Sequence, residues 1–180
     1  MRDEIKTERL TLRRTRNTDA QTMARRINDP EILRMTATLP MPYLSLSAEF
    51  WLMRATANWR RGVSFAYALT RADDSIMGVV DLFKNDQYDW EIGYWIAREF
   101  WGYGYMPEAA RGLLREGFRV FDVPYIDAGY FADNPASGRV LEKLGFIDKN
   151  EPSQLFSVAR GKRHEGIELR LSRNTAVRWQ

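Results

Sequence analysis

Residues 89–114, DWEIGYWIAREFWGYGYMPEAARGLL, change from strand-like to helix-like spacing across a short turn that contains two glycines. The first part alternates as a half-buried strand does, with one face formed by Trp90, Ile92, Tyr94 and Ile96 and the other by Glu91, Gly93, Trp95 and Ala97. After Gly102 and Gly104, apolar residues recur at helical spacing, at Ala109, Ala110, Leu113, Leu114, Phe118 and Phe121. The stretch therefore predicts a strand, a glycine turn and a helix, in that order.

A glycine turn that leads into a helix favours the binding of an anion. Glycine lets the main chain approach a ligand closely, and the first helical turn carries unpaired N–H groups at the positive end of the helix dipole. A phosphate group is therefore expected near residues 101–106. The segment lacks the Gly-Lys-Ser/Thr ending of the phosphate loop and the three glycines of the dinucleotide fingerprint. A plain turn without a ligand stays open as the alternative.

The rest of the chain predicts a mixed α/β (α+β) fold. Thr18 and Gln21 form a capping-box signature at the start of the first helix. A strand, a crossover helix and a second strand predict one parallel pair within an otherwise antiparallel sheet, with helices on both faces. We expect a single domain over residues 1–180. The expected strands cover 9–14, 64–70, 75–84, 90–97, 125–131, 146–148 and 164–171, and the helices 19–28, 31–35 and 48–61, the stretch after Gly104 and the stretch after Asn134.

A second motif, ADNPASGRVLEKLGF, begins at residue 132. Asn134 is the expected N-cap of its helix, Pro135 fits the first helical position and Gly145 supplies a left-handed C-terminal cap. Together with WGYGYMPEA, this motif resembles the GNAT N-acetyltransferases, in particular the Rim-type subgroup that acetylates ribosomal-protein N-termini. The Asn-x-x-Ser…Gly-Phe segment matches that family almost letter for letter. The resemblance covers Glu8 to about Leu171.

This resemblance implies acetyl-CoA as co-substrate and no metal. In the family, the pantetheine arm lies between two parallel strands that splay apart, here 90–97 and 125–131. The general family loop reads Arg/Gln-x-x-Gly-x-Gly/Ala. Trp101, Gly104 and Met106 occupy its three positions, so only the central glycine matches, whereas Trp-Gly-x-Gly-x-x-x-Glu-Ala is typical of the Rim-type branch. The residues expected to bind the cofactor are Ile96, Ala97, Arg98, Trp101, Gly102, Tyr103, Gly104, Tyr105, Met106, Asn134, Ser137, Arg139 and Lys143.

Two residues are the expected catalytic groups. Glu91 lies on the strand between two apolar residues, and partial burial would raise its pKa and suit it to act as a general base, through water. A solvent-facing strand acid is the alternative. Ser137 would protonate the thiolate or bind the pantetheine, because Leu141 stands where many family members have a tyrosine acid. A purely local hydrogen bond is its alternative. Trp101 and Leu141 also leave open a non-catalytic acyl-CoA-binding or protein-interaction module.

The acceptor is an amine that must be uncharged when it attacks. At neutral pH about one α-amine in ten is uncharged, but only about one lysine side chain in 2,500. A carboxylate base therefore suits a peptide N-terminal α-amine, and small amines stay open. Tyr43, Phe83 and Tyr130 are the candidate residues lining the acceptor cleft, with a packed surface aromatic as the alternative for Tyr43.

Composition excludes several other classes. The net charge is +3, and 22 of the 27 basic residues are arginines scattered along the chain, so no nucleic-acid partner is expected. The absence of cysteine excludes disulfides, thiolate metal sites and a cysteine nucleophile, and it favours a cytoplasmic location. A single histidine excludes multi-histidine metal sites. The start MRDEIKTERL does not resemble a signal peptide, and no apolar run predicts a membrane span. The tail around Trp179 fits either a homodimer interface or a packed chain end.

Overall fold

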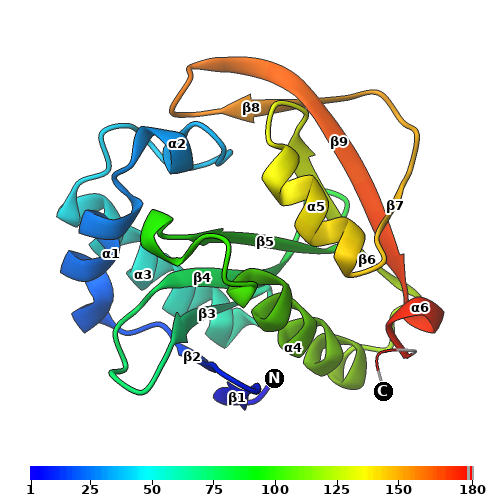
Figure 1. Ribbon diagram of the computed structural model, residues 1–180, viewed down its shortest axis with the longest axis horizontal. Coiled ribbons are helices and arrows are strands. Elements are labelled where there is room, and N and C mark those ends of the chain that lie inside the picture. Colours follow the sequence, from blue (N-terminus) through cyan, green and yellow to red (C-terminus); the bar gives the residue numbers. More distant parts are fainter. Residues whose placement is uncertain (178, 180) are drawn as a thin grey trace.

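The computed structural model describes residues 1–177 and 179, and in these residues helices flank a nine-stranded sheet (Figure 1). The strands are β1 (Glu4–Lys6), β2 (Thr11–Arg14), β3 (Ser64–Thr70), β4 (Gly78–Lys84), β5 (Trp90–Ile96), β6 (Tyr125–Phe131), β7 (Ile147–Asp148), β8 (Ser153–Ser157) and β9 (Lys162–Ser172). The helices are α1 (Ala20–Ile27), α2 (Pro30–Leu33), α3 (Ser45–Arg61), α4 (Tyr105–Val120), α5 (Pro135–Lys143) and α6 (Arg173–Val177), with short 3-10 turns at Asn17–Asp19 and Arg98–Phe100.

The sheet has the order β1-β2-β3-β4-β5-β6-β9-β7, and β8 pairs with the outer part of β9. Within the described residues all neighbouring strands are antiparallel except β5 and β6, which are parallel. The crossover between these two strands is α4, as the strand, helix and strand order predicted. The predicted fold class, a mostly antiparallel mixed sheet with one central parallel pair, is therefore confirmed.

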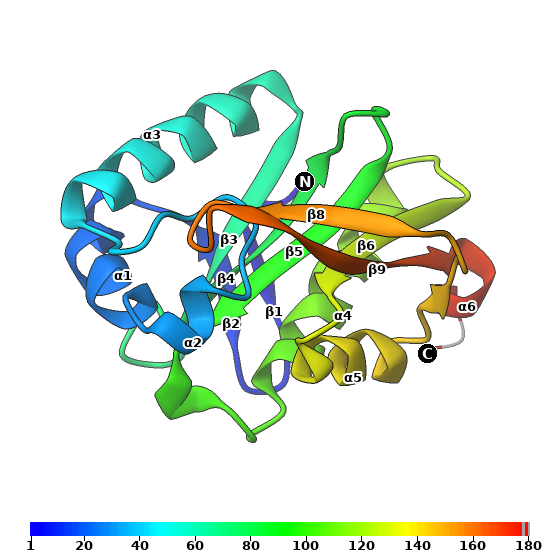
Figure 2. The same cartoon turned by 90° about the horizontal axis from the view of Figure 1, so that it is seen from above.

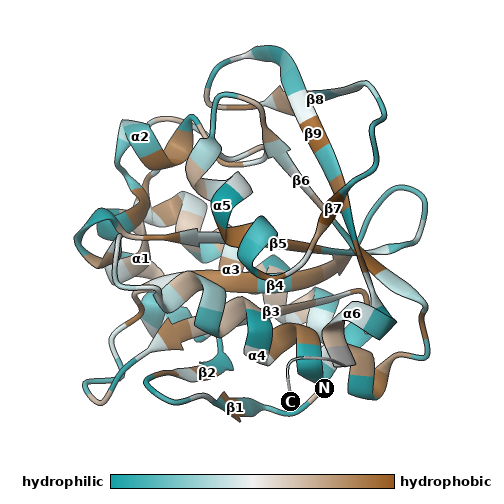
Figure 3. Cartoon of the chain, turned by 45° about the vertical axis from the view of Figure 1, so that its right-hand side comes forward, coloured by the Kyte–Doolittle hydropathy of each residue, from teal (hydrophilic) through white to brown (hydrophobic). Residues whose placement is uncertain are grey.

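The helices cover both faces of the sheet (Figures 1 and 2). Ala66 and Val79 point from β3 and β4 toward α1 and α3, whereas Tyr67 and Val80 point the other way, into the cluster that contains the apolar face of α4. All four of these side chains are at most 2% exposed. Figure 3 shows the hydrophobic residues concentrated on the central strands and on the helix faces that cover them. The central strands are therefore buried on both faces and form a rigid base for the site.

The hairpin of β8 and β9 crosses the molecule from α6 toward α1 and α2 (Figure 2). Its tip is tied to the loop between α2 and α3, because the Val158 N–H donates to the Ala37 carbonyl oxygen at 2.9 Å. The Ser157 hydroxyl also donates to the Thr36 carbonyl oxygen at 3.3 Å. This connection links the C-terminal hairpin to the N-terminal half of the chain.

Several elements differ from the expectations. The short strands β1 and β8 and the helix α6 were not expected, and β1 forms the edge of the sheet beside β2. The capping box at Thr18 and Gln21 is wrong, because Asp19 accepts the Arg16 N–H at 2.8 Å before α1 begins. Asp19 is fixed there by a bidentate ion pair with Arg13, with distances of 2.9 and 2.7 Å. This tertiary contact moves the start of the helix.

The C-terminal tail packs onto the protein itself. Trp179 contacts the cluster beneath α4, and the guanidinium of Arg111 lies 5.8 Å from its ring centroid. The structure thus shows Trp179 packed against its own chain, and a homodimer stays a prediction. In the described part of the chain, no helix has both the length and the hydropathy of a membrane span.

Candidate active site

The two parallel strands β5 and β6 separate after a short paired stretch. Their register contains only Glu91 opposite Asp127 and Ile92 opposite Ala128, although β5 continues to Ile96. The N–H of Ala97 donates to the Met77 carbonyl oxygen on the β4 side at 2.9 Å. Because N–H groups alternate along a strand, those of Tyr94 and Ile96 face the opposite side, into the opening. Of the expected donors near the end of β5, Ile96 thus faces the opening, whereas Ala97 does not.

The glycine loop after β5 presents a series of backbone donors. Gly102 and Gly104 have positive φ angles of 82° and 76°, which glycine adopts without strain. Among the described residues, the N–H groups of 102–106 have no hydrogen-bond acceptor. The first N–H group after these that has an acceptor in the loop is that of Glu108, which donates to the Gly104 carbonyl oxygen at 3.4 Å. Five adjacent amides at the start of α4 are thus available to an anion.

Trp101 has a different contact from the one expected of the family's arginine or glutamine. Its indole N–H donates to the Ile96 carbonyl oxygen at 2.9 Å, so the side chain folds back onto the end of β5. The guanidinium of Arg98 lies 5.6 Å from the Trp101 ring. Trp101 therefore ties the loop to the mouth of the opening. The rings of Tyr103 and Tyr105 stack at 5.7 Å beside it.

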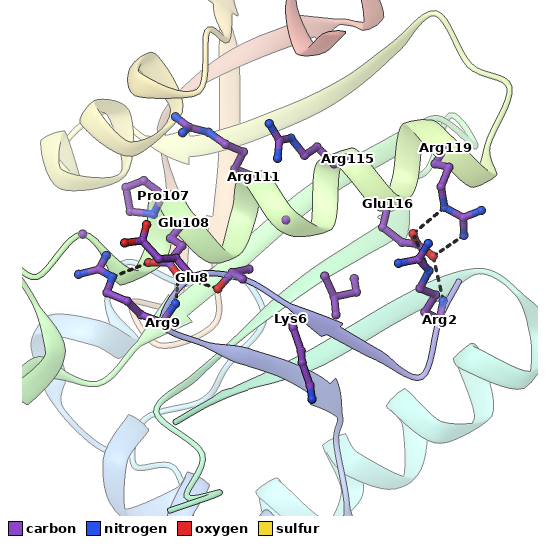
Figure 4. Close-up of a pocket in the computed structure, with 14 residues that line it drawn as sticks. Arg2, Lys6, Glu8, Arg9, Pro107, Glu108, Arg111, Arg115, Glu116 and Arg119 are labelled. Atoms are coloured by element: carbon purple, nitrogen blue, oxygen red, sulfur yellow. Dashed lines mark hydrogen bonds and ion pairs between the residues drawn. The ribbon is translucent and has the colours of Figure 1, made fainter. Parts of the chain in front are cut away.

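Arg9, which sequence reasoning missed, holds this loop from the other side. Its guanidinium donates to the Tyr103 carbonyl oxygen at 2.9 Å and to the Glu108 carboxylate at 2.7 Å. Burial opposes ionisation of Glu108, but hydrogen bonds from Thr7 and Arg9 outweigh it and lower the pKa of the carboxyl. Figure 4 shows this pair at one end of a groove of about 570 Å³ between α4 and residues 2–9. Glu108 thus anchors Arg9 and the start of the helix.

The first turn of α5 lies against β5. As predicted, the Asn134 side chain caps this helix, accepting the Ser137 N–H at 3.2 Å. The Ser137 hydroxyl is 2.8 Å from the hydroxyl of Tyr94, which reaches across the opening from β5. Leu141 is 1% exposed and packs in the core, so that position offers no proton donor. The long side chains Arg139 and Lys143 lie on the exposed face of the same helix.

Glu91 is one of the two β5 residues paired with β6, and its side chain lies on the face of β5 opposite to that of Tyr94. Burial, with a smaller contribution from the charge of Glu168, raises the pKa of Glu91 to about 7. A hydrogen bond from the Asn85 amide at 3.4 Å opposes this by favouring the ionised carboxylate, which lowers the pKa. The neighbouring Asp127 is held by Arg170 at 2.7 and 2.8 Å, so its charge is balanced by a partner. At neutral pH, Glu91 is thus close to half ionised and can both take and release a proton.

The three expected acceptor-lining residues lie in different places. Tyr43 is 2% exposed and packs in the hydrophobic cluster that contains residues of α1 and α3, so it is buried away from solvent. Phe83 is directly opposite Glu91 on β4 and shares its face. Tyr130 is on the α5 side of β6, with its hydroxyl oxygen 2.8 Å from the point that a Cβ on Gly138 would occupy. Phe83 therefore lies beside Glu91, and Tyr130 lies against the first turn of α5.

Sequence reasoning also missed Asn85 and Tyr94. Asn85 closes the turn before β5, where it accepts the N–H groups of Gln87 and Asp89 at 3.0 Å, which is a local signal that could have placed it. Tyr94 was assigned only to a strand face, and its partner on α5 is 43 residues away. In the described residues, no cluster of three or more His, Cys, Asp or Glu side chains is arranged to hold a metal ion.

Known proteins resemble this chain in sequence. Residues 9–147 match the protein family described as acetyltransferase (GNAT) domain. The chain is 27% identical over 146 residues to an uncharacterized N-acetyltransferase, p20, of Bacillus licheniformis, covering 80% of this chain and 82% of that protein. It is 29% identical over 110 residues to the putative ribosomal N-acetyltransferase YdaF of Bacillus subtilis (strain 168), covering 58% and 60%.

The fold also matches solved structures. One is RimJ of Mycobacterium smegmatis in complex with CoA-disulfide, with a TM-score of 0.83 and 20% sequence identity over 98% of this chain and 92% of that chain. The likeness of fold agrees with the sequence match, which spans well over half of the chain. This chain therefore belongs to the GNAT family of acetyltransferases and is an enzyme of the N-acetyltransferase class.

Proposed function

We propose that the protein transfers the acetyl group of acetyl-CoA to the N-terminal α-amine of a protein or peptide, directly, in a ternary complex. The observation that carries this proposal is the opening between β5 and β6, which leads to the unpaired amides at the start of α4. A flexible arm ending in a diphosphate fits such a site, because the arm can pair with the free strand edge and the diphosphate can accept from the amides.

The residues that would hold acetyl-CoA follow from this geometry. The amides of residues 102–106 would bind the diphosphate, and the Ile96 amide would polarise the thioester carbonyl. Asn134 and Ser137 border the path of the arm, while Arg139 and Lys143 can reach a further phosphate from the exposed face of α5. Bound acetyl-CoA supplies an activated acetyl group. The protein's own part is to orient that group and to manage protons.

Glu91 would act as the general base. A pKa of about 7 suits a group that must accept a proton from an α-ammonium near neutral pH. An α-amino group has a pKa near 7.7–8.0, so the proton transfer to Glu91 is nearly balanced. A lysine side chain, with a pKa near 10.4, would release its proton to Glu91 far less readily. The chemistry of Glu91 therefore favours an N-terminal α-amine as acceptor.

The relatives support a ribosomal acceptor and the binding of CoA. YdaF is described as a putative ribosomal N-acetyltransferase, and the M. smegmatis RimJ structure contains a CoA-disulfide. By analogy, an N-terminal segment of a ribosomal protein is the first acceptor to test. A small amine is the second.

The test combines release of free CoA with mass spectrometry of the acceptor. The panel contains peptides with free N-termini, the same peptides with a blocked N-terminus and an internal lysine, and small primary amines. We expect CoA release that depends on a free N-terminus, with the acetyl group on the α-nitrogen. Acetylation confined to lysine or to small amines would overturn the acceptor class. Failure of every amine to release CoA would overturn acetyl transfer itself.

A further inference from the structure

Tyr94 occupies a place in the opening that the proposed function has not used. It lies two residues beyond Ile92, the last residue of β5 that pairs with β6, and on the face that is turned toward α5. Its hydroxyl lies 2.8 Å from the Ser137 hydroxyl and 3.2 Å from the Ser137 carbonyl oxygen. Both contacts go to one residue, the proposed partner of the leaving sulfur.

The number of protons on these two hydroxyls restricts their hydrogen bonds. Each hydroxyl has one proton, and the Ser137 carbonyl oxygen can only accept. If Tyr94 donates to that carbonyl oxygen, the Ser137 proton is free to point back at Tyr94 and away from any ligand. If Tyr94 instead donates to the Ser137 hydroxyl oxygen, the Ser137 proton points away from Tyr94 and is available to a ligand in the opening. The oxygen to which Tyr94 donates therefore determines the direction of the Ser137 proton.

Tyr94 keeps its proton under ordinary conditions. Burial raises the pKa of its hydroxyl above the usual range, so Tyr94 acts as a hydrogen-bond donor rather than as an acid. The helix offers no substitute, because Leu141 is apolar and 1% exposed. The Tyr130 hydroxyl of β6 lies so close to Gly138, in the same turn of α5, that a Cβ there would be only 2.8 Å away. Ser137 is thus contacted by Tyr94 from β5, and its neighbour Gly138 lies against Tyr130 from β6.

From this arrangement we infer that Tyr94 is a positioning residue for the transfer reaction: it donates to the Ser137 hydroxyl oxygen and turns the Ser137 proton toward the sulfur of the thioester. The inference rests on the proposed function and adds a residue to it. The helix lacks a tyrosine that could reach the sulfur. Here the hydroxyl of Tyr94, on a strand, acts on the sulfur through Ser137, on the helix.

The chemical step balances as follows. The amine nitrogen forms a bond to the acetyl carbon, and the carbon–sulfur bond breaks with its electron pair remaining on sulfur. The proton that the amine loses passes through water to Glu91. Ser137 donates a hydrogen bond to the negative sulfur, and Tyr94 donates one to Ser137, so both hydroxyls retain their protons. A proton from the solvent neutralises the thiolate after it leaves.

The test is a double-mutant cycle with Tyr94→Phe, Ser137→Ala and the combined variant, assayed with acetyl-CoA and the best peptide acceptor. We expect Tyr94→Phe to lower kcat about tenfold while KM for acetyl-CoA changes less than about twofold. In the Ser137→Ala background the same change should have no further effect, because its partner is already absent. Tyr88→Phe, on a residue that is 76% exposed, is the matched control.

Two further measurements separate positioning from a structural role. Thermal unfolding and calorimetric binding of CoA should be the same for Tyr94→Phe and for the wild-type protein. With an active wild-type protein, an unchanged kcat in Tyr94→Phe would overturn the inference. So would a combined variant whose loss of kcat equals the product of the two single losses. A wild-type protein that never releases CoA would overturn the proposed function and this inference together.

Discussion

The guanidinium of Arg9 donates to the backbone carbonyl oxygen of Tyr103 at 2.9 Å, although 94 residues separate them in the chain. The contact fixes the glycine loop in the shape that leaves its amides unpaired. Glu108 completes the arrangement, because its carboxylate accepts from the Arg9 side chain at 2.7 Å and from the Arg9 N–H at 2.8 Å. A residue near the N-terminus thus shapes the proposed diphosphate site.

Replacing Arg9 with methionine should therefore weaken CoA binding. Loss of the contact to Tyr103 frees the loop, and ordering it on binding should raise the Kd for CoA by about tenfold. Isothermal titration with CoA measures the effect. Arg60→Met is the control, since Arg60 is exposed at the far end of α3. An unchanged Kd in Arg9→Met would show that the loop keeps its shape without the arginine.

Gly104 provides a second test of the loop, because its φ of 76° strains any other residue. Gly104→Ala should lose about 1–2 kcal/mol of stability and bind CoA at least tenfold more weakly. Gly62 has a similar φ of 70° at the end of α3, and a Cβ there would have no neighbour within 4 Å. Gly62→Ala should thus lose similar stability without losing CoA affinity. Equal affinities for CoA in the two variants would show that the loop does not bind the diphosphate.

Glu91→Gln should lower kcat by about a hundredfold while leaving the affinity for CoA unchanged, because glutamine keeps the shape but cannot accept the proton. Steady-state kinetics with calorimetry of CoA binding separates the two effects. Glu49→Gln, on the exposed face of α3, is the matched control. Wild-type turnover in Glu91→Gln would exclude Glu91 as the base.

The pH profile follows from the same residue. The carboxylate form of Glu91 is the base, and its pKa is raised to about 7, so kcat/KM should rise with pH through that value. Deprotonation of the acceptor α-amine should add a second rise in kcat/KM near pH 8. Glu91→Gln should lose the first rise and keep the second. A wild-type profile with no ionisation near pH 7 would contradict the assignment.

Asp81 gives a prediction on stability. Burial raises its pKa to about 6, despite hydrogen bonds from Ser64 and the Phe65 N–H. The folded protein therefore binds this proton more tightly than the unfolded chain, and the stability contributed by the protonated form is lost as pH rises through about 4–6. At pH 7.5, Asp81→Asn should be more stable than the wild-type protein by on the order of 2 kcal/mol, with a smaller difference at pH 4.5.

Urea unfolding at the two pH values measures this difference. Asp86→Asn, in the exposed turn before β5, is the control and should show no such dependence. A gain for Asp81→Asn that is the same at both pH values would mean that the ionisation of Asp81 is not its cause.

Local signals predicted much of this fold. The alternation over β5, the two glycines and the helical spacing of α4 all lie within one stretch, and the cap of Asn134 on Ser137 spans three residues. The short strands β1 and β8 were missed because three to five residues with few apolar positions give no clear period. Each of them pairs in a hairpin with the next strand along the chain, β1 with β2 and β8 with β9, so the brevity of the strands is the reason they were missed.

The site was predictable only where one residue's neighbours in sequence are also its neighbours in space. Glu91 could be proposed from its strand, but its raised pKa depends in part on Glu168, which a later strand brings close. The contacts of Arg9 with Tyr103 and of Tyr94 with Ser137 join segments 94 and 43 residues apart. No periodicity or motif encodes such pairs, so only the folded structure reveals them.

A crystal structure of the protein with CoA tests the central claim most directly. The account predicts that the pantetheine arm lies between β5 and β6, that the diphosphate accepts from the amides of residues 102–106, and that the sulfur lies beside Ser137. CoA bound instead in the arginine-lined groove between α4 and residues 2–9, with the opening between β5 and β6 unoccupied, would contradict it.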